Sequence, residues 1–378
     1  MGRRKIDRSK QVFHNVSTTL VALLDSASVL KTWSGKLLQN TVAVEIKAVS
    51  LRSSIHGARK RMKKGKSRRQ ISRVLEGLDL KRVEDETNAI LRADAKNRFQ
   101  GQVIDIAVDI HGIPYHGLSY EKKEEVNRSK QKDGTTRFHM FATAYLIGKN
   151  NKRFTLAIIF VPLGTTMREI VRGLLYVLRR YGITIRRLLL DKGFYSIEVV
   201  KLLRRLNIGF IIPMRGNRLK KKKGSYSTVY TLKSTIDGKP AELLVRAVSV
   251  IKYNRGKRFK HHGAMQLCFI VYGIDMSLHR IAEFYRKRFG IESSYKIDKS
   301  IRARTSSRNP AIRMFHFNAA VLIQNFWVTI KLVFCKRIDK TSVRMITIRD
   351  FADILLHWIR IFYGENTTIG PPRIESFV

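Results

Sequence analysis

The sequence is poor in cysteine and in acidic residues, and it contains no long apolar run. Its two cysteines, Cys268 and Cys335, are too few for a disulfide framework and too far apart for a CxxC zinc motif, so we expect a reducing compartment. No stretch reaches the roughly 18 to 20 apolar residues that span a bilayer, and the N-terminus lacks the apolar segment of a signal peptide. These absences predict an intracellular protein with no membrane partner.

The scarcity of acids leaves a large excess of positive charge. Seventy-four Lys and Arg residues face 29 Asp and Glu residues, which gives a formal net charge of +45. A compact particle with this charge repels itself unless it meets a polyanion. The bases recur from end to end instead of lining one amphipathic helix, which favours nucleic acid over an acidic membrane surface. The length of 378 residues and the hydrophobic content of 44% predict two or three folded domains.

The first hundred residues show helical spacing of apolar side chains, for example at Leu20, Leu23 and Leu24. The middle of this region carries nine Lys or Arg between Arg59 and Arg73. Such density suits contacts with the phosphates of duplex DNA, although a solvated face or a nuclear-localisation-like run would have the same composition. The candidate DNA-binding residues here are Arg59, Lys60, Arg61, Lys63 and Lys64.

From Gln102 the pattern changes to the strict alternation of β-strands. The segments predicted next are strands at 103–117, 137–148 and 152–164, a helix at 165–182, a strand at 185–191, a helix at 196–207 and a strand at 209–215. The first three strands predict an antiparallel meander, and the last strand-helix-strand unit predicts a right-handed parallel crossover. Two alternating segments within 216–276 predict a β-rich insertion, and helical patterns follow at 309–334 and 348–363.

Three acids stand where chemistry is expected. Asp109 lies on the first strand before a turn, Asp191 ends the fourth strand at the carboxyl edge of the sheet, and Glu292 follows the insertion. Converging carboxylates repel one another unless cations lie between them, and hard oxygen ligands suit Mg²⁺ or Mn²⁺. Two such ions about 4 Å apart can support an in-line phosphoryl transfer. Asp105 shares the strand parity of Asp109 and is an alternative first ligand, and Asp191 could instead be a helix N-cap.

The segment YRKRFGIESSYKIDK runs from Tyr285 to Lys299. On a single α-helix, a rotation of about 100° per residue would place Tyr285, Arg288, Glu292 and Lys299 within an arc of about 60°. A solvated helix with incidental ion pairs would show the same residues.

The spacing Y-(2)-R-(3)-E-(6)-K in this segment resembles the signature of one large group of bacterial and archaeal insertion-sequence transposases, most closely the compact archaeal type. DKGF at Asp191, VDIHG at Asp109 and RTSSRN from Arg304 support the resemblance, which covers roughly Val103 to Trp327. It implies an α/β fold with a ribonuclease H-like mixed-sheet core, a β-rich insertion before the last catalytic acid, a helical N-terminal domain and a helical C-terminal region. The expected divisions are 1–100 for DNA binding, 101–215 and 277–335 for the core, 216–276 for the insertion and 336–378 for the C-terminal helices.

The resemblance also implies a function. Asp109, Asp191 and Glu292 would be the catalytic triad and the ligands of two Mg²⁺ ions, with Mn²⁺ as an alternative. The protein would act as a dimer on double-stranded DNA, cutting the ends of its own insertion sequence and joining them to target DNA. It would be cytoplasmic and nucleoid-associated in a prokaryote. Two alternatives stay open: a non-catalytic DNA-binding descendant, and a nuclease that hydrolyses only.

The same resemblance assigns roles to the residues around Glu292. Tyr285, Arg288 and Lys299 would contact phosphates near the transposon end, with Lys296 adding to them. Some members of the group also stack a flipped base on a tryptophan of the insertion, but Trp33, Trp327 and Trp358 all lie outside it here. Tyrosines of the insertion could take that place: Tyr226, Tyr230, Tyr253 and Tyr272.

Overall fold

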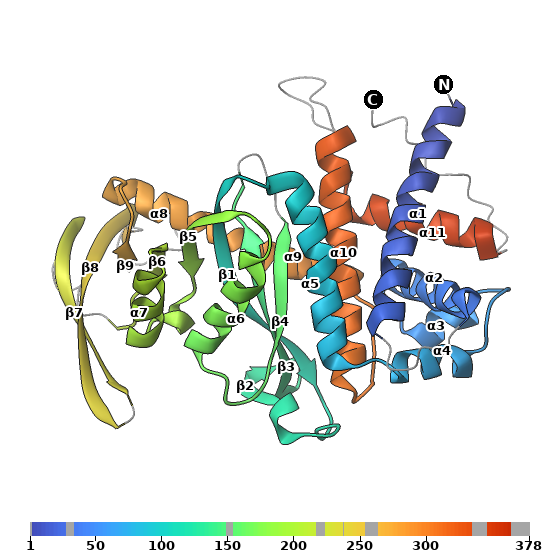
Figure 1. Ribbon diagram of the computed structural model, residues 1–378, viewed down its shortest axis with the longest axis horizontal. Helices are drawn as coiled ribbons and strands as arrows, with labels where there is room; N and C mark the ends of the chain where they lie inside the picture. The colour runs from blue at the N-terminus through green and yellow to red at the C-terminus, as the bar shows by residue number, and fades with distance from the viewer. Residues whose placement is uncertain are drawn as a thin grey trace.

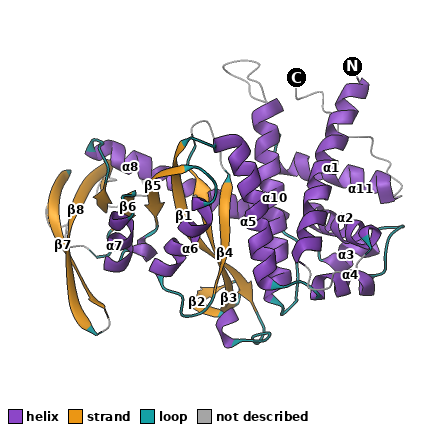
Figure 2. Ribbon diagram, in the orientation of Figure 1, coloured by secondary structure: helices purple, strands orange, loops and turns teal. Residues whose placement is uncertain are grey.

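The computed structural model describes residues 2–27, 34–148, 154–216, 224–236, 238–253, 264–334 and 346–363. Helices form both ends of the chain and strands form its middle (Figures 1 and 2). Trp33, Cys335 and, in the expected C-terminal region, residues 336–345 and 364–378 lie outside the described residues. No helix in the described ranges is long and apolar enough to cross a membrane.

In the described residues, five helices precede the sheet. They are α1 (Gly2–Ala27), α2 (Gly35–Leu51), α3 (Ile55–Lys60), α4 (Arg68–Glu76) and α5 (Leu80–Phe99). Ser34, Ser54, Ser67 and Asp79 each precede one of α2–α5, and each side chain accepts the backbone N–H three residues on. These caps satisfy donors that a first helical turn leaves unpaired, which explains where the helices begin.

The strands of the described residues form one mixed sheet of nine strands. They are β1 (Val103–Tyr115), β2 (Asn127–Lys132), β3 (Thr135–Leu146), β4 (Thr155–Val161), β5 (Thr184–Leu190), β6 (Gly209–Pro213), β7 (Tyr226–Ile236), β8 (Lys239–Tyr253) and β9 (Ala264–Tyr272). Their order is β2-β3-β1-β5-β6-β9-β8-β7, with β4 also paired to β3. The expectation of a mixed α/β fold is therefore confirmed.

The antiparallel meander and the parallel crossover that the sequence predicts are both present: β3 is antiparallel to β1 and β4, and β5 is parallel to β6. The parallel pairing of β1 with β5, which joins these two parts, is a further finding. The helices α6 (Met167–Arg179) and α7 (Ile197–Arg205) make the crossovers. The insertion strands β9, β8 and β7 extend this same sheet by antiparallel pairing from β6, so in the structure the insertion and the core share one sheet.

The strand β2 is absent from the sequence-based expectation. Its residues NRSKQK contain no apolar side chain, and all but the first are exposed. Pairing with β3 and the turn at Asp133 and Gly134, both with positive φ, hold it in place. The Asn127 side chain also donates to the carbonyl of Val161 at 2.8 Å. A strand held by hydrogen bonds and a turn leaves no hydrophobic alternation to detect.

Helices cover both faces of the sheet. One apolar cluster joins α6 and α7 to side chains such as Val108, Leu188 and Leu190. On the opposite face, α8 (Leu278–Arg286) and α9 (Gly290–Ile301) pack over Ala107 and Leu189. Neighbouring residues of one strand thus point to opposite clusters, as the period of two requires.

The terminal helices share a third core. The long helix α10 (Pro310–Phe334) runs beside α5 between the sheet and α1–α4, and α11 (Ile348–Tyr363) packs on α1 and α2 (Figure 1). Their apolar side chains form one cluster that also includes Phe141 and Ile158 of the sheet. A buried polar contact between Glu45 of α2 and His316 of α10 lies within it, with Nδ1 and Oε1 3.0 Å apart.

Asn88 fastens α5 to the strand β4. Its side chain donates to the carbonyl of Ile158 at 2.7 Å and accepts the N–H of Ile158 at 2.9 Å. We expect Asn88→Ala to lower the free energy of unfolding by about 2 kcal/mol or more, because it leaves two buried backbone groups unpaired. Chemical denaturation measures this.

The matched control is Asn15→Ala on the exposed face of α1. It should change stability by less than about 0.5 kcal/mol. Equal unfolding midpoints for the two variants would show that the contact with Ile158 does not stabilise the fold.

Candidate active site

The strand register places Asp109 and Asp191 side by side. Val108 of β1 is the parallel partner of Leu190 of β5, so the next residue on each chain is an aspartate. Each aspartate lies two residues beyond a side chain, Ala107 or Leu189, that faces α8 and α9. The period of two therefore turns both carboxylates toward the helices that carry the signature segment.

The signature segment is not one continuous helix, contrary to the expectation of a single helical stripe. α8 ends at Arg286, a 3₁₀ turn covers Lys287–Phe289, and α9 begins at Gly290. The change of helix type shifts the angular position of everything after Arg286, because a 3₁₀ turn holds three residues and an α turn holds 3.6. Arg288 lies in this turn and Glu292 in the first turn of α9.

All three acids converge on Arg288. Its Nη2 lies 3.0 Å from Oε1 of Glu292 and 3.6 Å from Oδ1 of Asp191, and its Nη1 lies 3.7 Å from Oδ2 of Asp109. The Arg288 side chain is 6% exposed, against 18% for Asp109, 45% for Asp191 and 48% for Glu292. The site is thus closed on the Asp109 side and open to solvent on the side of the other two acids.

Burial and like charges perturb the site. Burial, reinforced by Asp191 and Glu292 and opposed by Arg288, raises the pKa of Asp109 to about 6. The pKa of Arg288 is raised because the surrounding acids outweigh the effect of its burial. Positive charge placed among the three carboxylates lowers the pKa of Asp109 and so favours its ionised form.

Asp105, the alternative first ligand, is occupied elsewhere. Both of its oxygens accept bonds from Arg186 and from Arg187, at 2.8 to 3.1 Å. These two bidentate pairs bind β1 to β5 and hold the pKa of Asp105 below its usual value despite its burial. The alternative reading of Asp191 as a helix cap has no support either, since its side chain makes no capping bond and Ser196 caps α7.

The remaining signature residues occupy different environments. Tyr285 is buried, and its hydroxyl donates to the carbonyl of Leu190 at 3.2 Å, next to Asp191. Lys296 is exposed on α9. Lys299 is exposed and pairs with Asp133 of the β2–β3 turn at 3.1 Å.

Tyr295 is a positioning residue that the sequence alone did not single out. Its hydroxyl lies 2.6 Å from Thr143 on β3 and 3.4 Å from the carbonyl of Asp109. Its ring stacks on His111 at 4.4 Å. These contacts fix α9 to β1 and β3 at a point three residues after Glu292. In the sequence, only the spacing of Tyr295 one helical turn after Glu292 could have indicated this role.

The basic segment of the N-terminal region is mostly exposed. Lys60, Arg61, Lys63 and Lys64 all lie on the surface. Arg59 differs, because its guanidinium donates to the carbonyls of Met62, Gly65 and Lys66. It holds the shape of the loop that presents the other four bases.

The insertion tyrosines are partly buried in the part of the insertion that can be described. Tyr226 and Tyr230 pack against the core cluster, and Tyr272 stacks on Phe210 at 5.8 Å. The side chain of Tyr253, the basic run 217–223 and the basic turn 254–263 lie outside the described residues.

The donor set of the triad fits divalent cations. As arranged around Arg288, the described residues form no group of three or more acid, histidine or cysteine side chains that could hold a metal ion. The three carboxylates nevertheless meet at one guanidinium, and carboxylate oxygens are the ligands that Mg²⁺ and Mn²⁺ prefer. Arg288 Nε and Nη1 are buried without an acceptor, so the guanidinium is incompletely bonded at this position.

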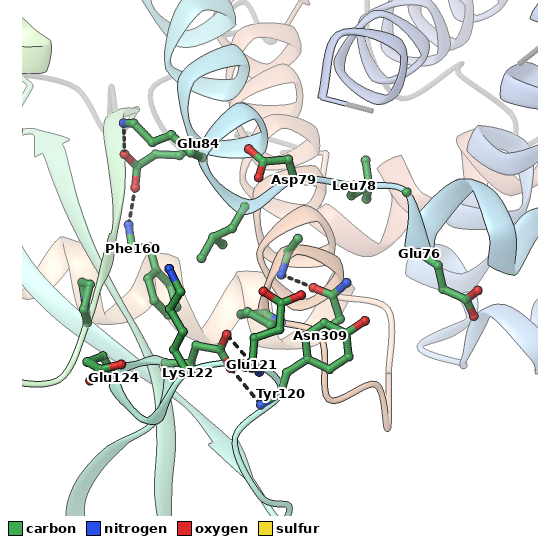
Figure 3. A pocket seen from close by; sticks show the side chains of 17 residues that line it. Glu76, Leu78, Asp79, Glu84, Tyr120, Glu121, Lys122, Glu124, Phe160 and Asn309 are labelled. Carbon is green, nitrogen blue, oxygen red and sulfur yellow. Dashed lines mark hydrogen bonds and ion pairs between the residues drawn. The ribbon is translucent and has the colours of Figure 1, made fainter. Parts of the chain in front are cut away.

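A separate acidic cavity of about 710 Å³ lies among α4, α5, the loop before β2 and the start of α10 (Figure 3). Glu84 there accepts the N–H of Phe160, and Glu125 accepts the N–H of Tyr120. Its acids are Glu76, Asp79, Glu84, Glu121, Glu124 and Glu125, and none belongs to the triad. The negative charge of these carboxylates disfavours phosphate binding, so this cavity is not the candidate DNA site.

Comparison with known proteins places the chain in a family. A family model described as Transposase DDE domain matches residues 101–326, and the chain therefore belongs to the DDE transposases. This span contains Asp109, Asp191 and Glu292. No curated protein matches the sequence at a significant level.

Solved structures show a similar fold at low identity. The piggyBac transposase, solved as a synaptic complex with hairpin DNA, gives a TM-score of 0.52 at 12% identity over 96% of this chain and 82% of that one. The *Drosophila* P element transposase strand transfer complex gives 0.31 at 12% identity over 100% and 96%. The first supports a transposase-like catalytic fold, whereas the second is too distant in fold to support an inference.

Asp298 on α9 generates a prediction about pH. It is 1% exposed, and burial, partly opposed by Arg302, raises the pKa of its carboxyl to about 8. The folded protein therefore keeps this proton up to about pH 8, while the unfolded chain loses it near pH 4, so stability falls as the pH rises between those values.

We expect the Asp298→Asn variant, which cannot ionise, to gain stability relative to the wild type between pH 5 and pH 8, on the order of 2 kcal/mol. Thermal unfolding at the two pH values measures the difference. A difference between the two proteins that stays constant with pH would contradict the raised pKa.

Proposed function

We propose that this protein is a DNA transposase of the insertion-sequence group with the Y-(2)-R-(3)-E-(6)-K signature, which cuts the ends of its own element and joins them to target DNA. The observation that carries the proposal is the meeting of Asp109, Asp191 and Glu292 at one point of a sheet edge. Membership of the DDE transposase family supports it.

Asp109, Asp191 and Glu292 would hold the divalent cations. Bound there, such ions supply the activation of the attacking oxygen and the stabilisation of the leaving oxygen in phosphoryl transfer. The chain itself contributes the positions of the ligands: parallel pairing of β1 and β5 sets the two aspartates, and Tyr295 fixes α9 and with it Glu292. Rigid ligand placement matters because phosphoryl transfer depends on alignment.

DNA is the proposed partner on grounds of charge. The net charge of +45 requires a polyanion, and exposed bases lie both on the loop after α3 and around α9. The piggyBac transposase, whose fold is similar, was solved in a complex with hairpin DNA. We propose further that two copies act together, each holding one end of the element, with the helical region 1–100 as the main DNA-binding part.

The triad is tested by single isosteric changes. We expect Asp109→Asn, Asp191→Asn and Glu292→Gln each to abolish cleavage of DNA that carries the terminal repeats of the element, in the presence of Mg²⁺, while end binding remains. Cleavage is followed on gels and binding by mobility shift. Cleavage by Glu292→Gln at the wild-type rate would refute the assignment.

The products separate the alternatives. A nuclease would release cut ends without joining them to target DNA, and a non-catalytic descendant would bind ends without cutting. Joined products from the wild type, absent from all three variants, identify the transposase.

The exposed bases after α3 are tested by salt dependence. Replacing Lys60, Arg61, Lys63 and Lys64 together by Gln should weaken DNA binding and reduce the slope of log K against log salt by about 3 to 4, since each phosphate contact contributes roughly 0.9. Fluorescence anisotropy between 50 and 200 mM salt measures the slope. An unchanged slope, with an unchanged circular dichroism spectrum, would show that this loop does not contact phosphates.

A further inference from the structure

We propose that Arg288 is the internal counter-ion of the triad: its guanidinium occupies the position of a divalent cation in the metal-free protein and must leave before a cation binds. The inference rests on the proposed function in one respect, namely that the triad is a metal site. It adds that metal binding and the position of Arg288 are mutually exclusive, which makes this residue a switch as well as a DNA contact.

Charge compensation by a single residue is the first step. In the described part of the chain, the ion pairs of Asp109, Asp191 and Glu292 all run to Arg288, at 3.7, 3.6 and 3.0 Å. Carboxylates that converge on one guanidinium repel one another, and the effect is largest at Asp109, the most buried of the three. The guanidinium therefore does in the metal-free protein what a cation would do in the loaded one.

Loose bonding is the second step. Only the contact with Glu292 is a hydrogen bond, and Nε and Nη1 of the buried guanidinium have no acceptor. Arg187 offers the contrast, because its Nε and Nη2 both bond Asp105 at 2.8 Å. Arg288 is thus held by charge without the directional bonds that would make it permanent, and its incomplete bonding lowers the cost of displacement.

A route of departure is the third step. Arg288 lies in the 3₁₀ turn between α8 and α9, and the neighbouring Phe289 is 47% exposed with its ring 5.3 Å from the guanidinium. The guanidinium thus already contacts an exposed aromatic ring, and it can keep this cation–π contact as it turns away from the acids. Because the acids nearest to it, Asp191 and Glu292, are about half exposed, the displaced group would emerge on the open side, where it can pair with a DNA phosphate.

Coupling between metal and DNA follows. If DNA phosphate attracts the displaced guanidinium, DNA must tighten metal binding, and metal must tighten DNA binding by the same factor. A protein with free access to Mg²⁺ would then load its site fully only when an end is present.

The experiment measures Mn²⁺ binding to the full chain by isothermal titration calorimetry, first without DNA. We expect Arg288→Gln to bind Mn²⁺ at least tenfold more tightly than the wild type, and to unfold at lower temperature without metal, because the acids lose their counter-ion. Arg288→Met, which keeps the apolar stem, should bind Mn²⁺ tightly as well and guards against a folding defect of one variant. The control Arg286→Gln removes the same charge at an exposed position two residues away and should bind like the wild type.

A second arm adds a DNA end. The affinity of the wild type for Mn²⁺ should rise toward that of Arg288→Gln, whereas the affinity of the variant should change little. Equal or weaker Mn²⁺ binding by folded Arg288→Gln and Arg288→Met overturns the counter-ion proposal and leaves the proposed function standing. Absence of Mn²⁺ binding in every protein, or binding that survives Glu292→Gln, overturns the metal site itself and with it both proposals.

Discussion

Repulsion between three carboxylates is the constraint on which the centre of this molecule depends. Asp109, Asp191 and Glu292 can approach one another only because Arg288 lies between them. The compensation is incomplete, since one guanidinium faces three acids and the pKa of Asp109 is still raised to about 6. The local structure serves this arrangement: the 3₁₀ turn between α8 and α9 brings Arg288 inward, and the hydroxyl of Tyr295 fixes the helix that carries Glu292.

The insertion supports the same arrangement from a distance. Its strands β8 and β9 continue the sheet from β6, and their side chains Val248 and Phe269 pack in one cluster with Ile281 and Tyr285 of α8. α8 in turn leads directly into the turn that carries Arg288. Placing an insertion before the last acid therefore extends the surface on which the helices of the site are packed. A deletion inside it would disturb the arrangement around Arg288 through this packing.

The parts of this arrangement that depend on strand parity were predictable from the sequence. Alternation along β1 and the apolar run of β5 placed Asp109 and Asp191 on their strands. The parallel pairing of β1 with β5, which sets the two aspartates side by side, is seen only in the structure. The break between α8 and α9 was not predictable, since YRKRFGIESSYKIDK contains no proline and has helical periodicity throughout. Tertiary contacts determine where the helix type changes: Tyr285 is buried against Leu190, and Tyr295 fixes α9 to β1 and β3. The strand β2 was not predicted because its residues after Asn127 are all exposed, so the sequence shows no alternation of apolar and polar side chains.

The charge at the triad is opposite in sign to the charge of the chain as a whole. The chain carries a net charge of +45, so phosphates are attracted to most of it without help. At the triad, however, negative charges outnumber the positive one, and a scissile phosphate would be repelled at the point where it must be held. Under the proposed function, added positive charge at that point would reverse the sign and release Arg288 toward the phosphate. A basic protein with an acidic centre would then bind DNA through its surface and form the reactive contact only once the centre is filled.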